Sequence, residues 1–377
     1  MSDTVARMER GVAAFPADEW DACAGDTNPF VSHAFLSALE ESGSATGRTG
    51  WQPVPIAVDG ADGRAAAILP AYAKSHSQGE YVFDHAWADA LERAGGRYYP
   101  KLQIAVPFSP VPGPRLLLRD ASLAPALLAA AEAVVEQNGL SSAHATFVAP
   151  EQVPLFEAAG WLIRADRQFH WANDGYRDFD DFLDRLASRK RKAIRKERAA
   201  AVEGLEIVHL TGAEIEERHW DAFWRFYQDT GARKWGQPYL TRRFFTLLGE
   251  RMGDAVILML ALRGGKPIAG ALNLVGRDTL YGRYWGATEE VPFLHFELCY
   301  YQAIDVAIAR GLKTVEAGAQ GSHKLARGYT PTPTWSAHYI ADPGFRRAVA
   351  DYLVREREAV AEDIEVLTEM GPFKRGG

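Results

Sequence analysis

The residues best suited to acid–base chemistry lie close together between Glu316 and His338. Glu316 ends a short apolar segment, and a glycine-rich loop that contains His323 follows it. A carboxylate at that point could take a proton from an ammonium group, and an imidazole could share this task or donate to an oxyanion. A structural role is the alternative, because Glu316 could pair with a cation of the loop and His338 could be a satisfied strand histidine. The predicted catalytic residues are Glu316, His323 and His338.

A second run of charge lies in residues 178–198, where aspartates come first and cations follow. Seven of the ten residues from 189 to 198 are Lys or Arg, and Glu197 is the one carboxylate among them. A helix whose charges complement its own dipole explains part of this sorting. The density of cations also suits phosphate groups, as do the cations of the glycine-rich loop. The predicted donor- or phosphate-binding residues are Arg191, Lys192, Arg195, Lys324 and Arg327.

The elements that must position Glu316 are expected to form an α/β unit. Three segments of strand length between residues 256 and 285 are separated by glycine-containing turns, which predicts a β-meander. Apolar residues then recur at helical spacing from 296 to 308, and residues 314–317 form a further strand. A crossover helix makes the last two strands parallel neighbours. Ligand sites of such sheets lie at the carboxyl ends of the strands.

Aromatic and proline residues are frequent in residues 75–114 of the first half. This composition does not suit a regular helix or a central strand, so we expect an ordered loop region. Ligand sites favour domain interfaces, which predicts that part of the region lines the acceptor side of a cleft. Packing of the rings on their own domain is the alternative. The predicted acceptor-binding residues, including two from a loop at residues 231–239, are Tyr81, Asp84, Tyr99, Lys101, Lys234 and Trp235.

Composition limits the class of protein. At 377 residues, with 47% hydrophobic and 24% charged residues, the chain is expected to bury the cores of two domains. A formal net charge of −7 argues against wholesale binding of nucleic acid, and no DNA partner is expected. Cys23 and Cys299 form neither a disulfide framework nor a metal pattern, so no metal is expected. No apolar run reaches transmembrane length, and a cytoplasmic protein is predicted.

The order of the expected elements divides the chain at about residue 165. A hairpin, a helix, a strand, a short helix and another strand precede this point, and a second series of elements begins just after it. We therefore predict one domain at residues 1–165 and another at residues 166–377. The second domain would carry the donor site, because it contains both clusters of cations.

Several multi-residue motifs of the chain resemble those of one family. In the second half they are RKRKAIRKERAA, YQDTGARKWGQPYL, GRYWGATEEVPFLHFELCYYQAID and EAGAQGSHKLARGY, and in the first half NPFVSHAFLSALEESG, GEYVFDHAW and YYPKLQIAVPFSPVPGPRLL. They resemble the Fem-like predicted N-acyltransferases of the GNAT superfamily over roughly residues 27–342. The resemblance implies an α/β (α+β) fold of two tandem GNAT-like domains, each a mixed sheet flanked by helices. Members are often described as related to peptidoglycan biosynthesis.

Two departures from the better-known relatives concern the acyl donor. Acetyl-CoA users of the superfamily open a helix with Arg or Gln, two residues, Gly, one residue, and Gly or Ala. The corresponding residues 283–288 end in Thr and are followed by Glu289 and Glu290, so a phosphate there would meet two carboxylates. The long helical arm that several Fem ligases insert is also missing. Acyl-CoA and aminoacyl-tRNA both stay open as the co-substrate.

Three functions are compatible with these features. The first is an N-acyltransferase that moves an acyl or aminoacyl group from an activated donor to a small-molecule or peptide-like amine, with no permanently bound cofactor. The second is a tRNA-dependent aminoacyl ligase of the cell-wall type, in which the basic segment would hold the nucleic acid. The third is a non-catalytic binding module on the same fold. The sequence lacks the phosphate-binding loop, the nucleophile elbow and the HExxH motif of other enzyme classes.

Overall fold

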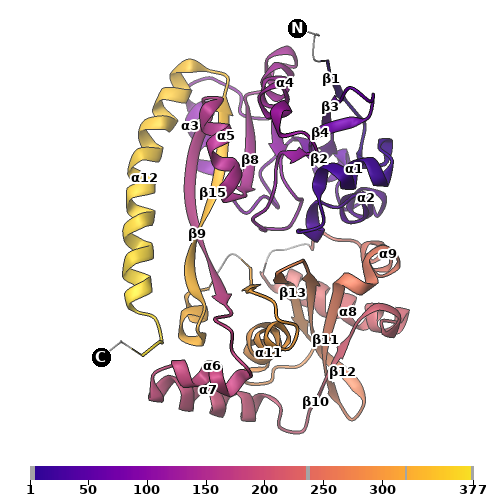
Figure 1. The fold of residues 1–377 in the computed structure, drawn as a ribbon, viewed down its shortest axis with the longest axis vertical. Coiled ribbons are helices and arrows are strands. Elements are labelled where there is room, and N and C mark those ends of the chain that lie inside the picture. Colours follow the sequence, from indigo (N-terminus) through magenta and orange to yellow (C-terminus); the bar gives the residue numbers. More distant parts are fainter. Residues whose placement is uncertain (1–4, 235–237, 319–320, 375–377) are drawn as a thin grey trace. The chain divides into compact units, whose positions relative to one another are not determined.

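The chain folds into two compact units, seen in the computed structural model of Figure 1. The first unit combines the residues up to Asp166 with Pro333–Glu362, and the second combines Arg167–Thr332 with the residues from Asp363 onward. The long strands β9 (Leu162–Ala172) and β15 (Thr330–Ile340) each contain residues of both units. The expected division at residue 165 lies beside the first crossing, but the expected domains did not include the return of Pro333–Glu362 to the first unit. The structure describes residues 5–234, 238–318 and 321–374.

The first unit contains a small sheet and the strands of a second one. The small sheet has the order β1-β3-β4-β7, and its β3–β4 hairpin turns where the glycines and aspartates of residues 59–63 indicate a turn. The other strands follow the order β15-β8-β6-β5-β2, with β6 parallel to β8 and the other pairs antiparallel. The bounds are β1 (Ala6–Met8), β2 (Trp51–Pro53), β3 (Ile56–Asp59), β4 (Ala65–Leu69), β5 (Ala71–Lys74), β6 (Lys101–Ile104), β7 (Leu117–Leu118) and β8 (Ser142–Val148).

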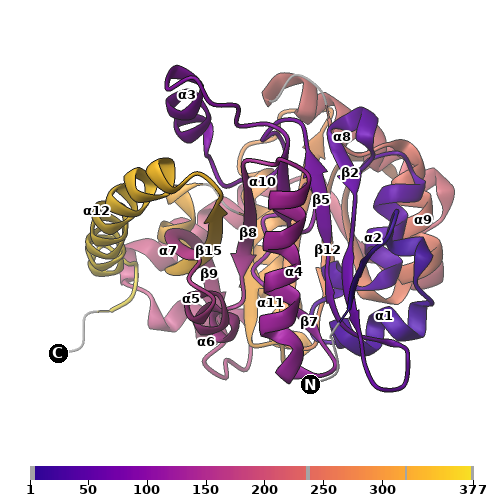
Figure 2. The same cartoon turned by 90° about the horizontal axis from the view of Figure 1, so that it is seen from above.

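Helices of the first unit pack their apolar stripes on these strands. Helix α4, which is labelled beside β8 in Figure 2, packs on β3, β4, β6 and β8. Leu127, Leu128 and Val135 of its buried face belong to the same core cluster as those strands. The region expected to be an ordered loop, residues 75–114, contains helix α3 and strand β6. The helical bounds are α1 (Ala17–Ala24), α2 (His33–Glu41), α3 (His85–Arg93), α4 (Ala124–Gln137), α5 (Val153–Ala158) and α12 (Pro343–Glu369), the last of which continues into the second unit.

The second unit contains the predicted meander. Its strands follow the order β10-β11-β12-β13-β14-β9, with β11, β12 and β13 antiparallel neighbours and β14 parallel to β13. Leu280 lies opposite Val315 in this parallel pair, and both are buried beneath the crossover helix. The parallel pair places Glu316 at the carboxyl end of β14, as the sequence predicts. The bounds are β10 (Glu206–Leu210), β11 (Val256–Arg263), β12 (Lys266–Val275), β13 (Thr279–Ala287) and β14 (Thr314–Glu316).

The helices of the second unit differ from the predicted ones in two places. The single helix expected over residues 178–198 is two helices, because Leu186 adopts an extended backbone between them. The crossover helix expected over residues 296–308 contains a π-helical turn at Glu297–Tyr301. Gly311, at φ 65°, follows its last turn. The bounds are α6 (Phe179–Arg185), α7 (Ser188–Ala201), α8 (Glu217–Lys234), α9 (Arg242–Met252), α10 (Leu294–Phe296) and α11 (Gln302–Ala309).

Within the described parts of the chain, no helix has both the length and the apolar character needed to cross a membrane.

Candidate active site

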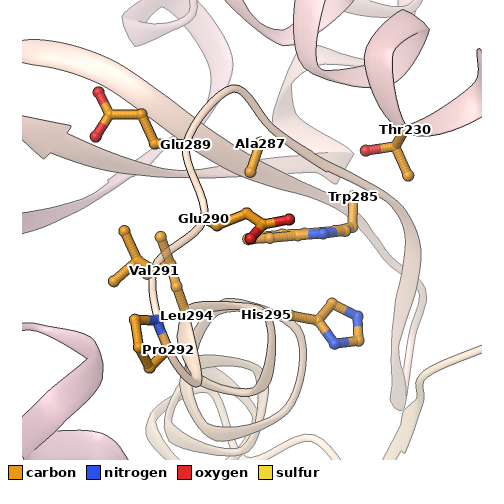
Figure 3. Close-up of a pocket in the computed structure, with 9 residues that line it drawn as sticks. All are labelled: Thr230, Trp285, Ala287, Glu289, Glu290, Val291, Pro292, Leu294 and His295. Carbon is orange, nitrogen blue, oxygen red and sulfur yellow. The ribbon is translucent and has the colours of Figure 1, made fainter. Parts of the chain in front are cut away.

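Two adjoining cavities of the second unit form the candidate active site. The larger hollow has a volume of about 570 Å³, and the smaller cavity one of about 90 Å³. Trp285 and His295 line both of them. The other residues around the larger hollow, drawn in Figure 3, are Thr230, Ala287, Glu289, Glu290, Val291, Pro292 and Leu294. Those around the smaller cavity are Ala271, Leu272, Asn273, Gly282, Arg283, Tyr284, Cys299, Tyr300 and Ala317.

Glycines of β13 allow other groups to approach its backbone at both cavities. A Cβ added at Gly286 would lie 2.1 Å from the carbonyl oxygen of Phe226, so α8 packs directly on the strand there. Gly282 lies opposite Asn273, where the register between β12 and β13 shifts. A Cβ at Gly282 would lie 3.2 Å from Oδ1 of Asn273. A side chain at this position would therefore crowd the polar end of the smaller cavity.

Asn273 presents an unused hydrogen-bond acceptor to the smaller cavity. The residue is fully buried, and its Nδ2 donates weakly to the carbonyl oxygens of Ile257 and Ala271, at 3.4 Å each. Its Oδ1 has no hydrogen-bond partner in the described part of the chain. A buried acceptor without a partner is unfavourable by about 1–3 kcal/mol. A ligand that brings an N–H or O–H group into the cavity would remove this cost.

Arg283 brings a buried positive charge to the same cavity. Its Nη2 donates to Oε2 of Glu316 at 3.0 Å, and the two side chains are only 2% and 8% exposed. Burial lowers the pKa of Arg283, and the carboxylate of Glu316 opposes that shift. The guanidinium remains charged, because its ordinary pKa is far above neutrality. Glu316, the predicted base, therefore has one carboxylate oxygen bound to this guanidinium.

The predicted loop residues lie behind the smaller cavity. Nε2 of His323 lies 2.9 Å from the hydroxyl of Tyr300, which lines the cavity. Lys324 is 1% exposed and donates from Nζ to the carbonyl oxygen of Gly318 at 2.6 Å. Burial is the main cause that lowers the pKa of Lys324 to about 7, and the positive charge of Arg283 contributes to the same shift. His323 thus contacts a residue that lines the cavity, whereas Lys324 binds the backbone of Gly318, next to the lining residue Ala317.

Arg327, a predicted donor-binding cation, contacts protein groups. Its Nη2 lies 2.8 Å from Oε2 of Glu197, and its guanidinium carbon lies 3.5 Å from the ring centroid of Phe296. Nη1 donates to the carbonyl oxygen of His323 at 2.8 Å. These contacts fix the loop against α7 and the start of the crossover helix. Binding of a donor by Arg327 stays a prediction.

His338 belongs to the first unit, whereas Glu316 and His323 belong to the second. Its Nδ1 lies 2.7 Å from Nδ1 of His144, and its ring meets Trp87 edge to face at 4.9 Å. Burial lowers the pKa of His338 well below its ordinary value, and the nearby His144 lowers it further. The imidazole is therefore neutral in its surroundings.

Three of the predicted acceptor-binding residues meet in the interior of the first unit. Lys101 is fully buried and donates from Nζ to Oε2 of Glu80 at 2.7 Å, to Oγ of Ser77 at 2.8 Å and to Asp84. The hydroxyl of Tyr99 lies 2.8 Å from the same Ser77 oxygen. We call these five residues the Lys101 network. Their contacts join β6 to the segment before α3.

The other predicted acceptor-binding residues lie apart from the Lys101 network. Tyr81 is partly buried and has a left-handed backbone at φ 59°. Lys234 is the last residue of α8, and its side chain, like the whole of Trp235, lies outside the described residues. The role of all six residues in acceptor binding stays a prediction.

The basic helix α7 pairs part of its charge with the preceding helix α6. Arg191 lies 2.8 Å from Asp184, and Arg195 lies 2.7 Å from Asp180. Both aspartates and Arg195 are more than half exposed, whereas the side chain of Arg191 is 24% exposed, so these pairs contribute little to stability. Lys192 is exposed and makes no ion pair within the described residues. Phosphate binding by the three cations stays a prediction.

A family model described as peptidoglycan biosynthesis/recognition, FemAB-like, matches residues 11–375. The chain belongs to the FemAB-like family. Its fold is also similar to solved structures, although no curated protein matches the sequence. FemX has 12% identity and a TM-score of 0.55, over 91% of this chain and 100% of that one. L-PGS from Bacillus licheniformis has 11% identity and a TM-score of 0.51, over 88% and 98%.

A third similar structure is the C-terminal domain of a putative lysylphosphatidylglycerol synthetase from Agrobacterium fabrum. It has 10% identity and a TM-score of 0.54, over 90% of this FemAB-like chain and 95% of that one. Identities this low establish a shared fold and leave activity to be argued from the site. The predicted α/β class is confirmed, because each unit combines strands with flanking helices and the fold is shared with FemX. Family and fold together identify a FemAB-like protein.

The turn after β13 of the FemAB-like chain does not fit the diphosphate of acyl-CoA. Glu289 and Glu290 line the larger hollow at this turn, and no Lys or Arg is among its described lining residues. The crossover helix begins at Leu294, after this acidic turn. A phosphate in the hollow would therefore meet the negative charge of Glu290, and none of the described lining residues would compensate it with a cation.

Four residues of the site were not among the predicted site residues: Asn273 and His295, and also Arg283 and Trp285, which entered only as part of the segment 283–288. Two of them carry a recognisable signal, because Asn273 and Arg283 are polar residues inside strands that are otherwise apolar or aromatic. A buried strand position that keeps a polar side chain is informative. His295 follows the end of β13 by a few residues, at the edge where the sheet presents ligand sites. The structure places all four around one cavity.

Proposed function

We propose that the protein transfers an acyl or aminoacyl group from an activated donor to an amine, and that the smaller cavity holds the reacting atoms. One observation carries this proposal: Arg283 and Asn273 line the same 90 Å³ cavity. Arg283 supplies N–H donors with positive charge, and Asn273 supplies an unused acceptor. Amide formation needs both, because charge develops on the carbonyl oxygen while the amine nitrogen must be oriented through its hydrogens.

The reaction follows from these two groups. The amine nitrogen attacks the acyl carbon, a carbon–nitrogen bond forms, and the bond from that carbon to the donor's sulfur or oxygen breaks. Arg283 stabilises the oxygen of the tetrahedral intermediate, and Asn273 Oδ1 accepts a hydrogen bond from the attacking nitrogen. Glu316 holds the guanidinium in place through its 3.0 Å contact. The donor's leaving group departs with the electron pair of the broken bond.

His295 is the proposed proton acceptor for the amine. It lines both cavities, and its ring meets that of Trp285 edge to face at 5.2 Å. Imidazole is the side chain most often used for this task near neutral pH. His323 contacts the hydroxyl of Tyr300 and so acts through that residue. This assignment gives Glu316, which the sequence suggests as the base, a positioning role.

The donor is an acyl thioester or an aminoacyl ester. The acidic turn after β13 supports a donor whose phosphates lie outside the larger hollow. An aminoacyl-tRNA is compatible with this, because its acyl ester is separated from the first phosphate by the terminal ribose, and the exposed Lys192 of α7 lies in a basic helix. The family description supports a peptide-like amine of a cell-wall precursor as acceptor.

A paired substitution tests the role of Arg283. Arg283→Met alone would leave the buried Glu316 carboxylate without its partner, so we combine it with Glu316→Met. Removing one oxyanion donor should lower the turnover number about 10²–10³-fold. Amide formation would be measured by mass spectrometry with acetyl-CoA and with an aminoacyl-tRNA as donors. Asp278→Ala/Lys313→Ala, which removes an exposed ion pair, is the control and should leave turnover unchanged.

Two results would overturn the proposed function. One is a native protein that forms no amide from either donor. The other is a double variant that keeps its melting temperature and its turnover, because Arg283 would then take no part in the reaction.

A further inference from the structure

The larger hollow has an acidic and aromatic wall. Its volume of about 570 Å³ is sufficient for a small organic molecule, and none of its described lining residues is a cation. In Figure 3 the indole of Trp285 is seen edge-on, with the side chain of Glu290 toward one end of it and the imidazole of His295 below it, and all three line the hollow. These three side chains come from the end of β13 and the turn and helix that follow.

The two adjacent carboxylates of this turn differ in their surroundings. Glu289 points away from Trp285 in Figure 3, and its Oε2 lies 3.5 Å from Nη1 of Arg263. Glu290 makes no ion pair or hydrogen bond within the described residues, and it lines the same hollow as Trp285. Glu290 therefore contributes its charge to the hollow, whereas the charge of Glu289 is partly balanced on the outside.

A carboxylate beside the face of an indole favours an alkyl ammonium group. The carboxylate attracts the charge, and the indole face adds a cation–π interaction. An ammonium held in this way is not the attacking nitrogen, because its lone pair carries a proton. The unused oxygen of Asn273 lies in the adjoining cavity, which shares Trp285 and His295 with the hollow.

We propose that the acceptor amine carries a second amino group, separated from the first by an alkyl chain. One amino group enters the smaller cavity and is acylated beside Asn273, while the other stays protonated between Glu290 and Trp285. This inference rests on the proposed function, since it assigns the acceptor of the same reaction. It gives the hollow a role in selecting the acceptor and explains why no described cation lines it.

Three five-carbon probes that share one primary amine test this proposal. They are 1,5-diaminopentane, 1-aminopentane and 5-aminopentanoate, whose far ends are cationic, neutral and anionic. Calorimetric binding to the full chain without donor should be tightest for the diamine, by about two- to fivefold over 1-aminopentane, and weakest for the anion. The preference should shrink as salt is raised.

Substitutions in the hollow identify the residues that cause the preference for the diamine. Glu290→Gln should bring the three affinities together, and Trp285→Leu should reduce the advantage of the diamine, while Glu289→Gln should leave the order unchanged. Glu290 is exposed, so its substitution should not move the melting temperature. A native protein that binds 1-aminopentane as tightly as the diamine, or a Glu290→Gln variant that keeps the native order, would overturn the inference.

The same series separates this inference from the proposed function. If the affinities follow the expected order but no amide forms from either donor, the hollow is a diamine site and the transferase assignment fails. If amide forms and Glu290→Gln leaves the preference for the diamine intact, the transferase assignment stands and the diamine site is rejected.

Discussion

His295 and His323 lie near the same cavity but contact it differently. Their ring centroids are 6.2 Å apart, and only His295 is among the residues described as lining the smaller cavity. We therefore expect His295→Gln to lower the turnover number by about 10²–10⁴-fold and to remove the acidic limb of the pH–rate profile. His323→Gln should lower turnover less, because His323 acts through Tyr300. Steady-state rates across a pH series would show this, and near-native turnover of His295→Gln would return the base role to Glu316.

Lys324 makes stability depend on pH in a direction that can be stated in advance. Burial lowers its pKa to about 7 from an ordinary value of 10.5. As pH falls below 10.5 the unfolded chain binds this proton, whereas the folded chain binds it only near pH 7. Above pH 10.5 Lys324 is neutral in both states, so its protonation does not lower the free energy of unfolding. As pH falls from 10.5 to about 7, this free energy decreases. Below about pH 7 both states bind the proton, and the decrease is complete.

Lys324→Met should remove this loss. The free energy of unfolding of the variant, relative to the native chain, should be higher near pH 7 than near pH 9.5, by about 1–3 kcal/mol. Denaturant titrations of both proteins at the two pH values measure the difference between their free energies of unfolding. The contributions of all other titrating groups are the same in both proteins and cancel in this difference. Equal differences at both values would mean that Lys324 keeps its proton in the folded chain.

At the scale of residues, the sequence predicted the positions of candidate site residues in the fold better than it predicted their side-chain contacts. Glu316 was expected at the carboxyl end of a strand and lies there. Its contact with Arg283 could not be predicted, because the two are 33 residues apart and meet only through the register of β13 and β14. The position of His295 in both cavities depends on the turn after β13, which has no regular pattern in the sequence.

The first unit buries a group of opposite charges whose disruption would lower the free energy of unfolding. Lys101 begins β6, is fully buried, and binds Glu80 and Asp84. Burial alone would lower the pKa of Lys101, but the two carboxylates raise it above its ordinary value. Burial also raises the pKa of Glu80 to about 7. The folded state therefore depends on keeping the lysine and both carboxylates together.

Lys101→Met should destabilise the protein by about 3–5 kcal/mol, because two buried carboxyl groups lose their cation. Thermal and denaturant unfolding would measure this change. The matched control is Lys313→Met, which breaks an exposed pair with Asp278 and should change stability by about 1 kcal/mol or less. A small effect of Lys101→Met, equal to that of the control, would show that the network contributes nothing net to folding.

At the scale of elements, regular patterns were predicted and interruptions were not. The meander and the crossover helix have strong periodicity in the sequence, and both are present. The break at Leu186 has no local signal, because Leu186 pairs as an isolated bridge with Phe373, far along the chain. Helix α3 was obscured by the aromatic and proline residues around it, although its own sequence is amphipathic.

At the scale of the whole molecule, the sequence indicated two units but assigned part of the chain to the wrong neighbours in space. Residues 334–340 have a strand pattern, and periodicity alone cannot say which strand they pair with. In the structure, Ala337 and Ile340 pair with Ala145 and Ser142 of β8, in the first unit. Such a pairing between distant segments depends on how the side chains of the whole sheet pack together, which the pattern of one strand does not contain.

The return of Pro333–Glu362 to the first unit also bears on how the protein is made. A ribosome releases Ser142–Val148 long before it releases the residues that pair with this strand, since almost the entire second unit is translated in between. The edge of β8 that β15 will occupy is open during that interval. The first unit is therefore completed only after residues 167–332 have been made, and the nascent chain must keep an unfinished sheet from pairing with other chains until β15 emerges.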